Sequence, residues 1–230
     1  MADDPDELQA AHRESHIEAV LALGAALALQ LALAVASLAN GWKLAGLRGW
    51  VWLIPAAWEV GILAALLVRL GSGPDAQAGG RRRLVLAGLA VLGAFNALAL
   101  AALMVSLVAR HATSGGQLLF EAASVWLTNV VAFGLLYWEL DRGGPLSRSL
   151  PSPPRADFQF PQMENPDLAP PGWRPQMFDY IYVSFTNATA FSPTDSMPLS
   201  RRAKALMLVQ SAISIVTILL VTARAVNVLH

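Results

Sequence analysis

Long apolar runs separated by short polar segments dominate the pattern along the chain. Four runs qualify clearly as membrane-spanning segments, at residues 20–38, 50–70, 84–108 and 203–226. A fifth run, 118–138, includes Thr128 and Asn129 and ends in Tyr137 and Trp138, an aromatic pair typical of the membrane interface. A helix needs about 20 apolar residues to cross about 30 Å of hydrocarbon. The pattern therefore predicts an all-α integral membrane protein with about five transmembrane helices.

The composition agrees with lipid as the solvent of this chain. Hydrophobic residues make up 55% and charged residues 14%, and mean hydropathy is +0.49. The formal net charge is zero and cysteine is absent, so we expect no nucleic-acid partner, no disulfide and no thiolate metal site. Fourteen of the sixteen basic residues are arginine, a bias typical of GC-rich bacterial genomes. We therefore expect a multi-pass protein of a bacterial inner membrane.

Four regions follow from these segments. Residues 1–18 form an acidic N-terminal segment, unlike the basic start of a cleavable signal peptide, so the first apolar run is expected to be retained. Residues 19–138 form a four-helix membrane region. Residues 139–176 form a loop with nine prolines, which exclude a regular helix or central strand, so an extended loop is expected. Residues 177–230 contain a short semi-apolar segment and the final span.

The orientation prediction rests on basic residues outside the spans. With five spans, twelve basic residues fall on the N-terminal side of the membrane and four on the other side. The triplet 81–83, three consecutive arginines in a short connection, contributes most. Because basic residues concentrate in cytoplasmic loops, the N-terminus is predicted to be cytoplasmic.

Residues 177–198 are too short and too polar to cross a bilayer, and they have the layout of a re-entrant loop: an aromatic half-helix, a polar turn and then a full span. Within it, SFTNATAFSPTDSMP resembles the pore-loop stretch SFTTLTTVGYGDIVP of potassium channels. The positions that match in register are Ser184, Phe185, Thr186, Thr189, Asp195 and Pro198. The resemblance covers about residues 177–226 and implies a pore loop in a homo-oligomer, a tetramer if channel-like. The polar residues that it places in and around the turn are Thr186, Asn187, Thr189, Ser192, Thr194 and Asp195.

The chain departs from that family at the selectivity filter. Potassium filters use backbone carbonyls as ligands, and the filter glycines allow the required backbone conformation. Residues 190–194 contain no glycine, and Pro193 fixes φ near −65°. Potassium channels also hold this loop on the external side, whereas the basic residues here place it on the cytoplasmic side. A potassium-selective filter is not expected, and the pattern also resembles bacterial membrane proteins to which no function is assigned.

Glu59 is the acidic residue that the sequence places near the middle of a predicted span, four residues after Pro55. An ionisable group at that depth costs several kcal/mol unless it is paired or hydrated, so a functional site is one interpretation, with proton coupling as its role. The alternative is a protonated Glu59 that is hydrogen-bonded to Asn96, Asn129 or a carbonyl freed by Pro55. Neither interpretation is preferred at this point.

Other polar residues within spans have a simpler interpretation. Asn96, Asn129 and Gln210 are expected to form hydrogen bonds between helices, each worth about 0.6 kcal/mol. Gln210, Ser214 and Thr217 follow helical spacing and could instead line a polar pathway.

His12 and His16 stand four residues apart, but two ligands do not make a metal site, and no metal or cofactor is predicted. Common enzyme motifs are absent from the sequence. The leading hypothesis is therefore a pore or transport protein for an ion or small solute. The alternative is a non-conducting scaffold or partner-binding protein on a channel-derived fold. A membrane enzyme that uses Glu59 or Asp195 as an acid or base is the third and weakest hypothesis.

Overall fold

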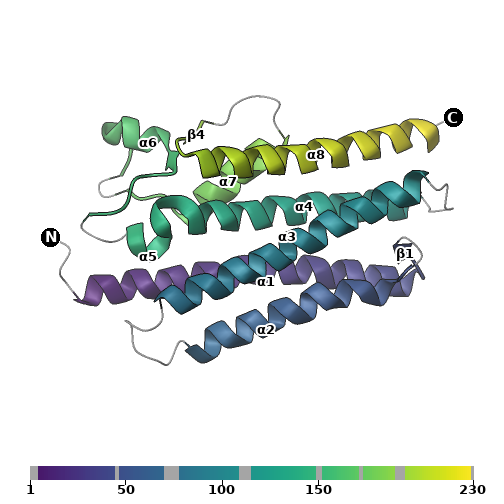
Figure 1. Ribbon diagram of the computed structural model, residues 1–230, viewed down its shortest axis with the longest axis horizontal. Helices are drawn as coiled ribbons and strands as arrows, with labels where there is room; N and C mark the ends of the chain where they lie inside the picture. The colour runs from purple at the N-terminus through teal and green to yellow at the C-terminus, as the bar shows by residue number, and fades with distance from the viewer. Residues whose placement is uncertain are drawn as a thin grey trace.

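The computed structural model describes residues 5–44, 47–69, 78–108, 115–148, 152–170, 173–189 and 195–228, and these residues are mostly helical. Five helices of 17 residues or more lie side by side along the long axis of the molecule (Figure 1). Their bounds are α1 (Pro5–Ala39), α2 (Leu53–Arg69), α3 (Ala78–Val108), α4 (Gly115–Leu140) and α8 (Arg201–Val228). Helices α1, α3, α4 and α8 each contain one of the apolar runs, and α2 covers most of the run 50–70.

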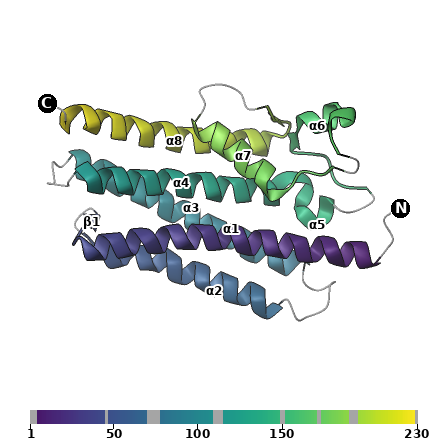
Figure 2. The same cartoon turned by 180° about the vertical axis from the view of Figure 1, so that it is seen from behind.

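Helix α4 lies at the centre of the bundle. It contacts α1 and α3 on one side and α8 on the other, and α2 packs against α1 and α3 (Figure 2). Accordingly α4 is the most buried of the long apolar helices, whereas α8 lies at the edge and is mostly exposed. A short hairpin of β1 (Lys43–Leu44) and β2 (Leu47–Arg48) follows α1, and η1 (Gly49–Trp52) leads into α2.

Three helices of the described chain are long and apolar enough to cross a membrane, over Arg82–Val105, Gly116–Gly143 and Arg201–Ala223. A shorter apolar helical stretch, Leu23–Ala39, lies within α1. The mostly helical structure and these three helices support the predicted helical membrane protein, and the count of five spans stays a prediction.

The chain turns sharply after α4, at the end of the bundle where α1 begins. Arg142, Gly143 and Gly144 all have positive φ, in the short helix η2 (Asp141–Gly143) and just after it. At this turn the buried Asp141 side chain contacts the following loop. Asp141 accepts hydrogen bonds from the backbone N–H groups of Asp157, at 2.7 Å, and Phe158, at 3.2 Å. The carboxylate thereby fastens the proline-rich loop to the end of α4.

The loop is folded rather than uniformly extended. Its short elements are α5 (Pro145–Arg148), β3 (Phe158–Gln159), α6 (Pro161–Glu164) and η3 (Pro166–Leu168). Helices α5, α6 and η3 each start with proline. Proline fits the first helical position because the N–H that it lacks would have no partner there in any case. The prolines therefore limit helix length but also initiate short helices.

Aromatic packing completes the attachment of this loop. Phe158 and Phe160 are buried and contact the ring of Tyr180 edge-to-face, and Phe158 also packs on Tyr137 of α4. Strand β3 pairs antiparallel with β4 (Met197–Pro198), which directly precedes α8. The loop is thus part of the folded core at this end of the bundle.

Candidate functional site

The short helix α7 (Met177–Thr189) occupies the space between α4 and α8 (Figures 1 and 2). Near its start, the Tyr180 hydroxyl donates to Asp141 at the end of α4, at 2.7 Å. Near its end, the carbonyl of Ala188 accepts from the indole N–H of Trp126, midway along α4, at 3.5 Å. Leu199 lies near Asp157 again, because its N–H donates to the carbonyl of Asp157. Among the described residues, the start of α7 and Leu199 therefore lie at the same end of the bundle, near Asp141 and Asp157.

Gln210 of α8 is the centre of a buried polar network that holds α7. Its Nε2 donates to the carbonyl of Ser184 at 2.9 Å and to the Ser184 hydroxyl at 2.6 Å. Its Oε1 accepts from the Tyr137 hydroxyl at 2.5 Å and from Nδ2 of Asn187 at 2.8 Å. Gln210 is fully buried, and these four bonds join α4, α7 and α8.

Asn187 and Asn129 extend the network along α8. Asn187 also donates to the carbonyl of Met207, and it accepts a bond from the Ser211 hydroxyl. Asn129 of α4 donates to Ser214 at 2.9 Å. The structure thus brings together three residues singled out from the sequence, namely Asn129, Asn187 and Gln210.

The remaining polar residues of the resemblance behave differently. The hydroxyls of Thr186 and Thr189 donate to carbonyls within α7 itself, three and four residues back. Asp195 is exposed and accepts a hydrogen bond from the Tyr182 hydroxyl at 3.2 Å. Ser192 and Thr194 lie outside the described residues, so the arrangement of the turn itself stays a prediction.

Glu59 lies apart from this network, on α2. Its carboxyl group accepts a hydrogen bond on Oε1 from Nε2 of Gln30 on α1, at 2.8 Å. Glu59 is 1% exposed and Gln30 is 5% exposed. The second oxygen of each group, Oε2 of Glu59 and Oε1 of Gln30, is buried and has no hydrogen-bond partner among the described residues. The described partner of Glu59 is therefore Gln30, which was not among the partners considered from the sequence, and Asn129 bonds to Ser214 of α8 instead.

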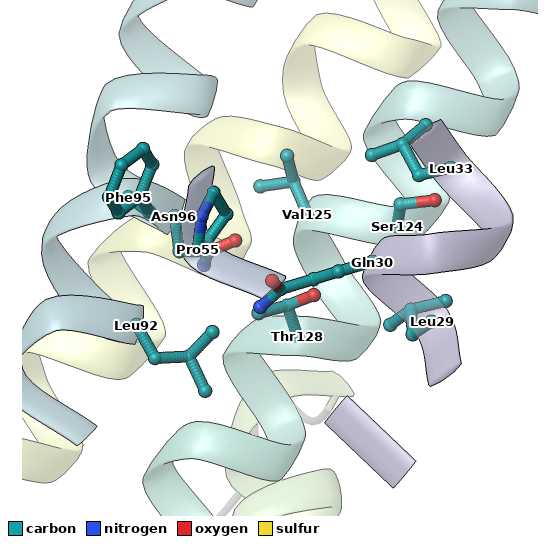
Figure 3. Close-up of a pocket in the computed structure, with 10 residues that line it drawn as sticks. All are labelled: Leu29, Gln30, Leu33, Pro55, Leu92, Phe95, Asn96, Ser124, Val125 and Thr128. Atoms are coloured by element: carbon teal, nitrogen blue, oxygen red, sulfur yellow. The ribbon is translucent and has the colours of Figure 1, made fainter. Parts of the chain in front are cut away.

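A small cavity lies beside Gln30, and apolar side chains make up most of its lining. Its volume is about 20 Å³, which is room for about one water molecule. The side chain of Gln30 extends into it, next to Thr128 (Figure 3). Asn96 of α3 and Ser124 of α4 are further polar lining residues, and Pro55, one turn before Glu59, closes another side. Helices α1 to α4 therefore line a small cavity with a few polar side chains, separate from the Gln210 network.

Several buried polar residues of the helices were not identified as site residues from the sequence. Gln30 is a lone amide in an apolar run, a signal of the kind that singled out Gln210. Glu121 is a second buried acid in a span, and it accepts a hydrogen bond from Gln117 one turn earlier, at 3.0 Å. Ser184 was matched to the pore-loop pattern but was not expected to bond to α8. Of the two histidines considered for a metal, His12 and His16, the side chains lie outside the described part.

Past the end of α7, helices α4 and α8 leave an apolar groove of about 250 Å³. Small and branched side chains line it, among them Ala122, Ala123, Ile218 and Val221. Thus α7 fills the part of the α4–α8 interface nearest the loop, and the groove continues that interface toward the opposite end of the bundle.

No protein-family model, no curated protein and no solved structure matches this chain.

Proposed function

We propose that this chain is a multi-pass membrane protein that conducts or transports an ion or small solute, with α7 as a re-entrant half-helix. The proposal assigns the five spans to α1, α2, α3, α4 and α8. The observation that carries it is the placement of the described residues on both sides of the turn: Tyr180 bonds to Asp141, Ala188 bonds to Trp126, and Leu199 bonds to Asp157. This is the layout that the pore-loop resemblance implies.

The length of α7 supports a half-helix. Thirteen residues extend about 20 Å at about 1.5 Å per residue, which is short of the roughly 30 Å of hydrocarbon. Backbone that ends at such a depth needs partners, because lipid provides none. Trp126 donates to the carbonyl of Ala188. Asn187 of α7 donates to the carbonyl of Met207 and to Oε1 of Gln210, so the end of α7 has fixed polar contacts. In this proposal they hold the helix so that the following turn faces a polar pathway.

A pathway of this type requires more than one copy of the chain, since one half-helix cannot enclose a central pore. The outer face of α7 has the surface for such contacts: Phe178 is 76% exposed, and Tyr182 and Phe185 are each 46% exposed. Leu208 of α8 is 71% exposed and adds to the exposed apolar surface. We therefore propose a homo-oligomer, and potassium selectivity is not part of the proposal because residues 190–194 contain no glycine.

The test is ion flux through the purified protein in liposomes, measured for K⁺, Na⁺, H⁺ and Cl⁻. The wild type is compared with Asp195→Asn, which removes the acidic group that follows the turn. The matched control is Asp167→Asn, because Asp167 is also exposed but lies in the proline-rich loop. A change in rate or ion preference with Asp195→Asn alone supports the proposal. Absence of flux from folded, oligomeric protein would contradict it for these ions.

A non-conducting scaffold is the second candidate, and one observation favours it. The polar atoms of Ser184, Asn187 and Gln210 are directed to one another and to neighbouring backbone, so they act in holding the helices together. In that case α7 has a structural role and does not line a pathway. Flux that is absent while a specific protein partner binds the assembled oligomer would support this candidate.

A further inference from the structure

We propose that Glu59 is a proton-binding site in which the neutral carboxylic acid and the Gln30 amide form a reciprocal pair. In this pair Nε2–H of Gln30 donates to Oε1 of Glu59, as the structure shows, and the proton on Oε2 of Glu59 is donated to Oε1 of Gln30. This inference does not depend on the α7 pathway, because it concerns α1 and α2 only.

Two of the four side-chain polar atoms of Glu59 and Gln30 are buried without a hydrogen-bond partner among the described residues. An ionised carboxylate only accepts hydrogen bonds, whereas a protonated one also donates. With Glu59 ionised, two buried acceptors remain unsatisfied, Oε2 of Glu59 and Oε1 of Gln30. A single proton on Oε2 converts one of these acceptors into a donor for the other. Buried polar groups are nearly always paired, so the protonated pair is the arrangement that satisfies both residues.

No charged side chain is found at the described hydrogen bond of Glu59 or among the described residues that line the cavity beside Gln30. The described hydrogen-bond partner of Glu59 is Gln30, which is neutral. The polar residues that line this cavity from α3 and α4 are Asn96, Ser124 and Thr128, which are also uncharged. An isolated charge at this place would be expensive, because no cation among these residues offsets the loss of hydration. Binding one proton removes that charge.

In this proposal the cavity beside Gln30 is the place where the proton is exchanged. The cavity volume of about 20 Å³ matches about one water molecule, and the polar groups in its lining are hydroxyls and amides. A water molecule held there could pass a proton to or from the Gln30–Glu59 pair, with the proton leaving Oε2 and the carboxylate remaining. The site therefore has an acid, a polar partner and, beside Gln30, space for about one water molecule.

The test is difference infrared spectroscopy of the purified protein in lipid at neutral pH, in H₂O and D₂O. A protonated carboxyl group gives a C=O stretching band that shifts on deuteration. We expect this band in the wild type, its loss in Glu59→Gln, and its shift to higher frequency in Gln30→Met, where the hydrogen-bonding amide is gone. The matched control is Glu121→Gln, which removes the other buried Glu–Gln pair and should leave the Glu59 band in place.

Three results would overturn the proposal. One is a band that persists in Glu59→Gln and disappears in Glu121→Gln, which would assign the proton to the other pair. Another is a carboxylate band from Glu59 at neutral pH. The third is a protonated band that appears only after Na⁺ is replaced by choline, which would make Glu59 a cation ligand. Each variant is accepted for the comparison only if it retains the wild-type helical content and oligomer size.

Discussion

Gly134 of α4 lies directly against Ile181 of α7, with no room for a side chain between them. A Cβ atom at Gly134 would be 3.2 Å from Cα of Ile181 and 2.5 Å from its Cδ1. The Cδ1 atom can move, but the Cα atom belongs to the backbone of α7. The close approach of these two helices therefore depends on glycine at this position.

We predict that Gly134→Ala destabilises the protein by about 1–3 kcal/mol, because overpacking forces α7 away from α4. The measurement is unfolding in mixed micelles, titrated with a denaturing detergent. Gly93→Ala is the matched control: Gly93 also lies within a long helix, but nothing is within 4 Å of its Cβ position. Alanine there should be neutral or stabilising. Adding Ile181→Val should recover part of the loss at Gly134, and equal effects at both glycines would contradict the prediction.

Gln210 should be the most sensitive polar position of α8. Gln210→Ala removes its four hydrogen bonds to Ser184, Tyr137 and Asn187. At about 0.6 kcal/mol for each bond between membrane helices, the expected loss is roughly 2 kcal/mol. Thr222→Ala is the control, because the described hydrogen bond of Thr222 is to the carbonyl of Ile218 within the same helix. The same detergent titration separates the two, and a loss no larger than that of Thr222→Ala would refute the importance of the network.

Arg148 contacts the C-terminal end of α4 through a hydrogen bond and through two aromatic rings, and lysine cannot form both kinds of contact together. Its Nη1 donates to the carbonyl of Trp138 at 2.6 Å, and its guanidinium carbon lies 5.7 Å and 5.1 Å from the ring centroids of Trp138 and Tyr180. Because the planar guanidinium group stacks on rings while it donates, Arg148→Lys should cost about 1–2 kcal/mol. Thermal unfolding in detergent provides the measurement. Arg155→Lys in the exposed part of the loop should leave the midpoint unchanged, and a similar shift in both would count against this interpretation.

The helices were predictable from the sequence because a membrane span needs only one local property, a long apolar run. The attachment of the proline-rich loop was not predictable, since its anchors are distant in the chain. Asp141 bonds to Asp157 and Tyr180, which lie 16 and 39 residues away. Proline content indicated correctly that long elements are excluded, but it carries no information about which carboxylate accepts the loop backbone.

At the polar sites, the sequence likewise identified single residues but not the residues with which they form hydrogen bonds. The sequence singled out Asn129 and Gln210 because polar groups in spans are conspicuous, but their positions are 81 residues apart and their contact depends on how α4 faces α8. Glu59 was likewise conspicuous, whereas its partner Gln30 was overlooked. Hydropathy finds helices and not the rotation of each helix about its axis, so it cannot assign the pairs.

The ion pair of Asp157 and Arg202 joins the proline-rich loop to the start of α8. Arg202 donates from Nε to Oδ1 at 2.9 Å and from Nη2 to Oδ2 at 2.8 Å. The Asp157 side chain is 2% exposed, and that of Arg202 is 58% exposed. Burial alone raises the pKa of Asp157, but the hydrogen bonds from Arg202 and Ser200 and the charge of Arg202 together outweigh it and lower the pKa below its ordinary value.

This lowered pKa predicts an acid-dependent loss of stability. The folded protein binds the proton of Asp157 less readily than the unfolded chain, whose aspartates have a pKa of about 3.9. The stabilisation is therefore complete above that value and is lost as the pH falls through the lower, folded pKa. The thermal unfolding midpoint of the wild type should fall over this acidic range, and Asp157→Asn should be less stable at neutral pH with a flatter dependence. Asp167→Asn, in the exposed part of the loop, should retain the wild-type slope. Parallel curves for the wild type and Asp157→Asn would show that this carboxylate does not carry the effect.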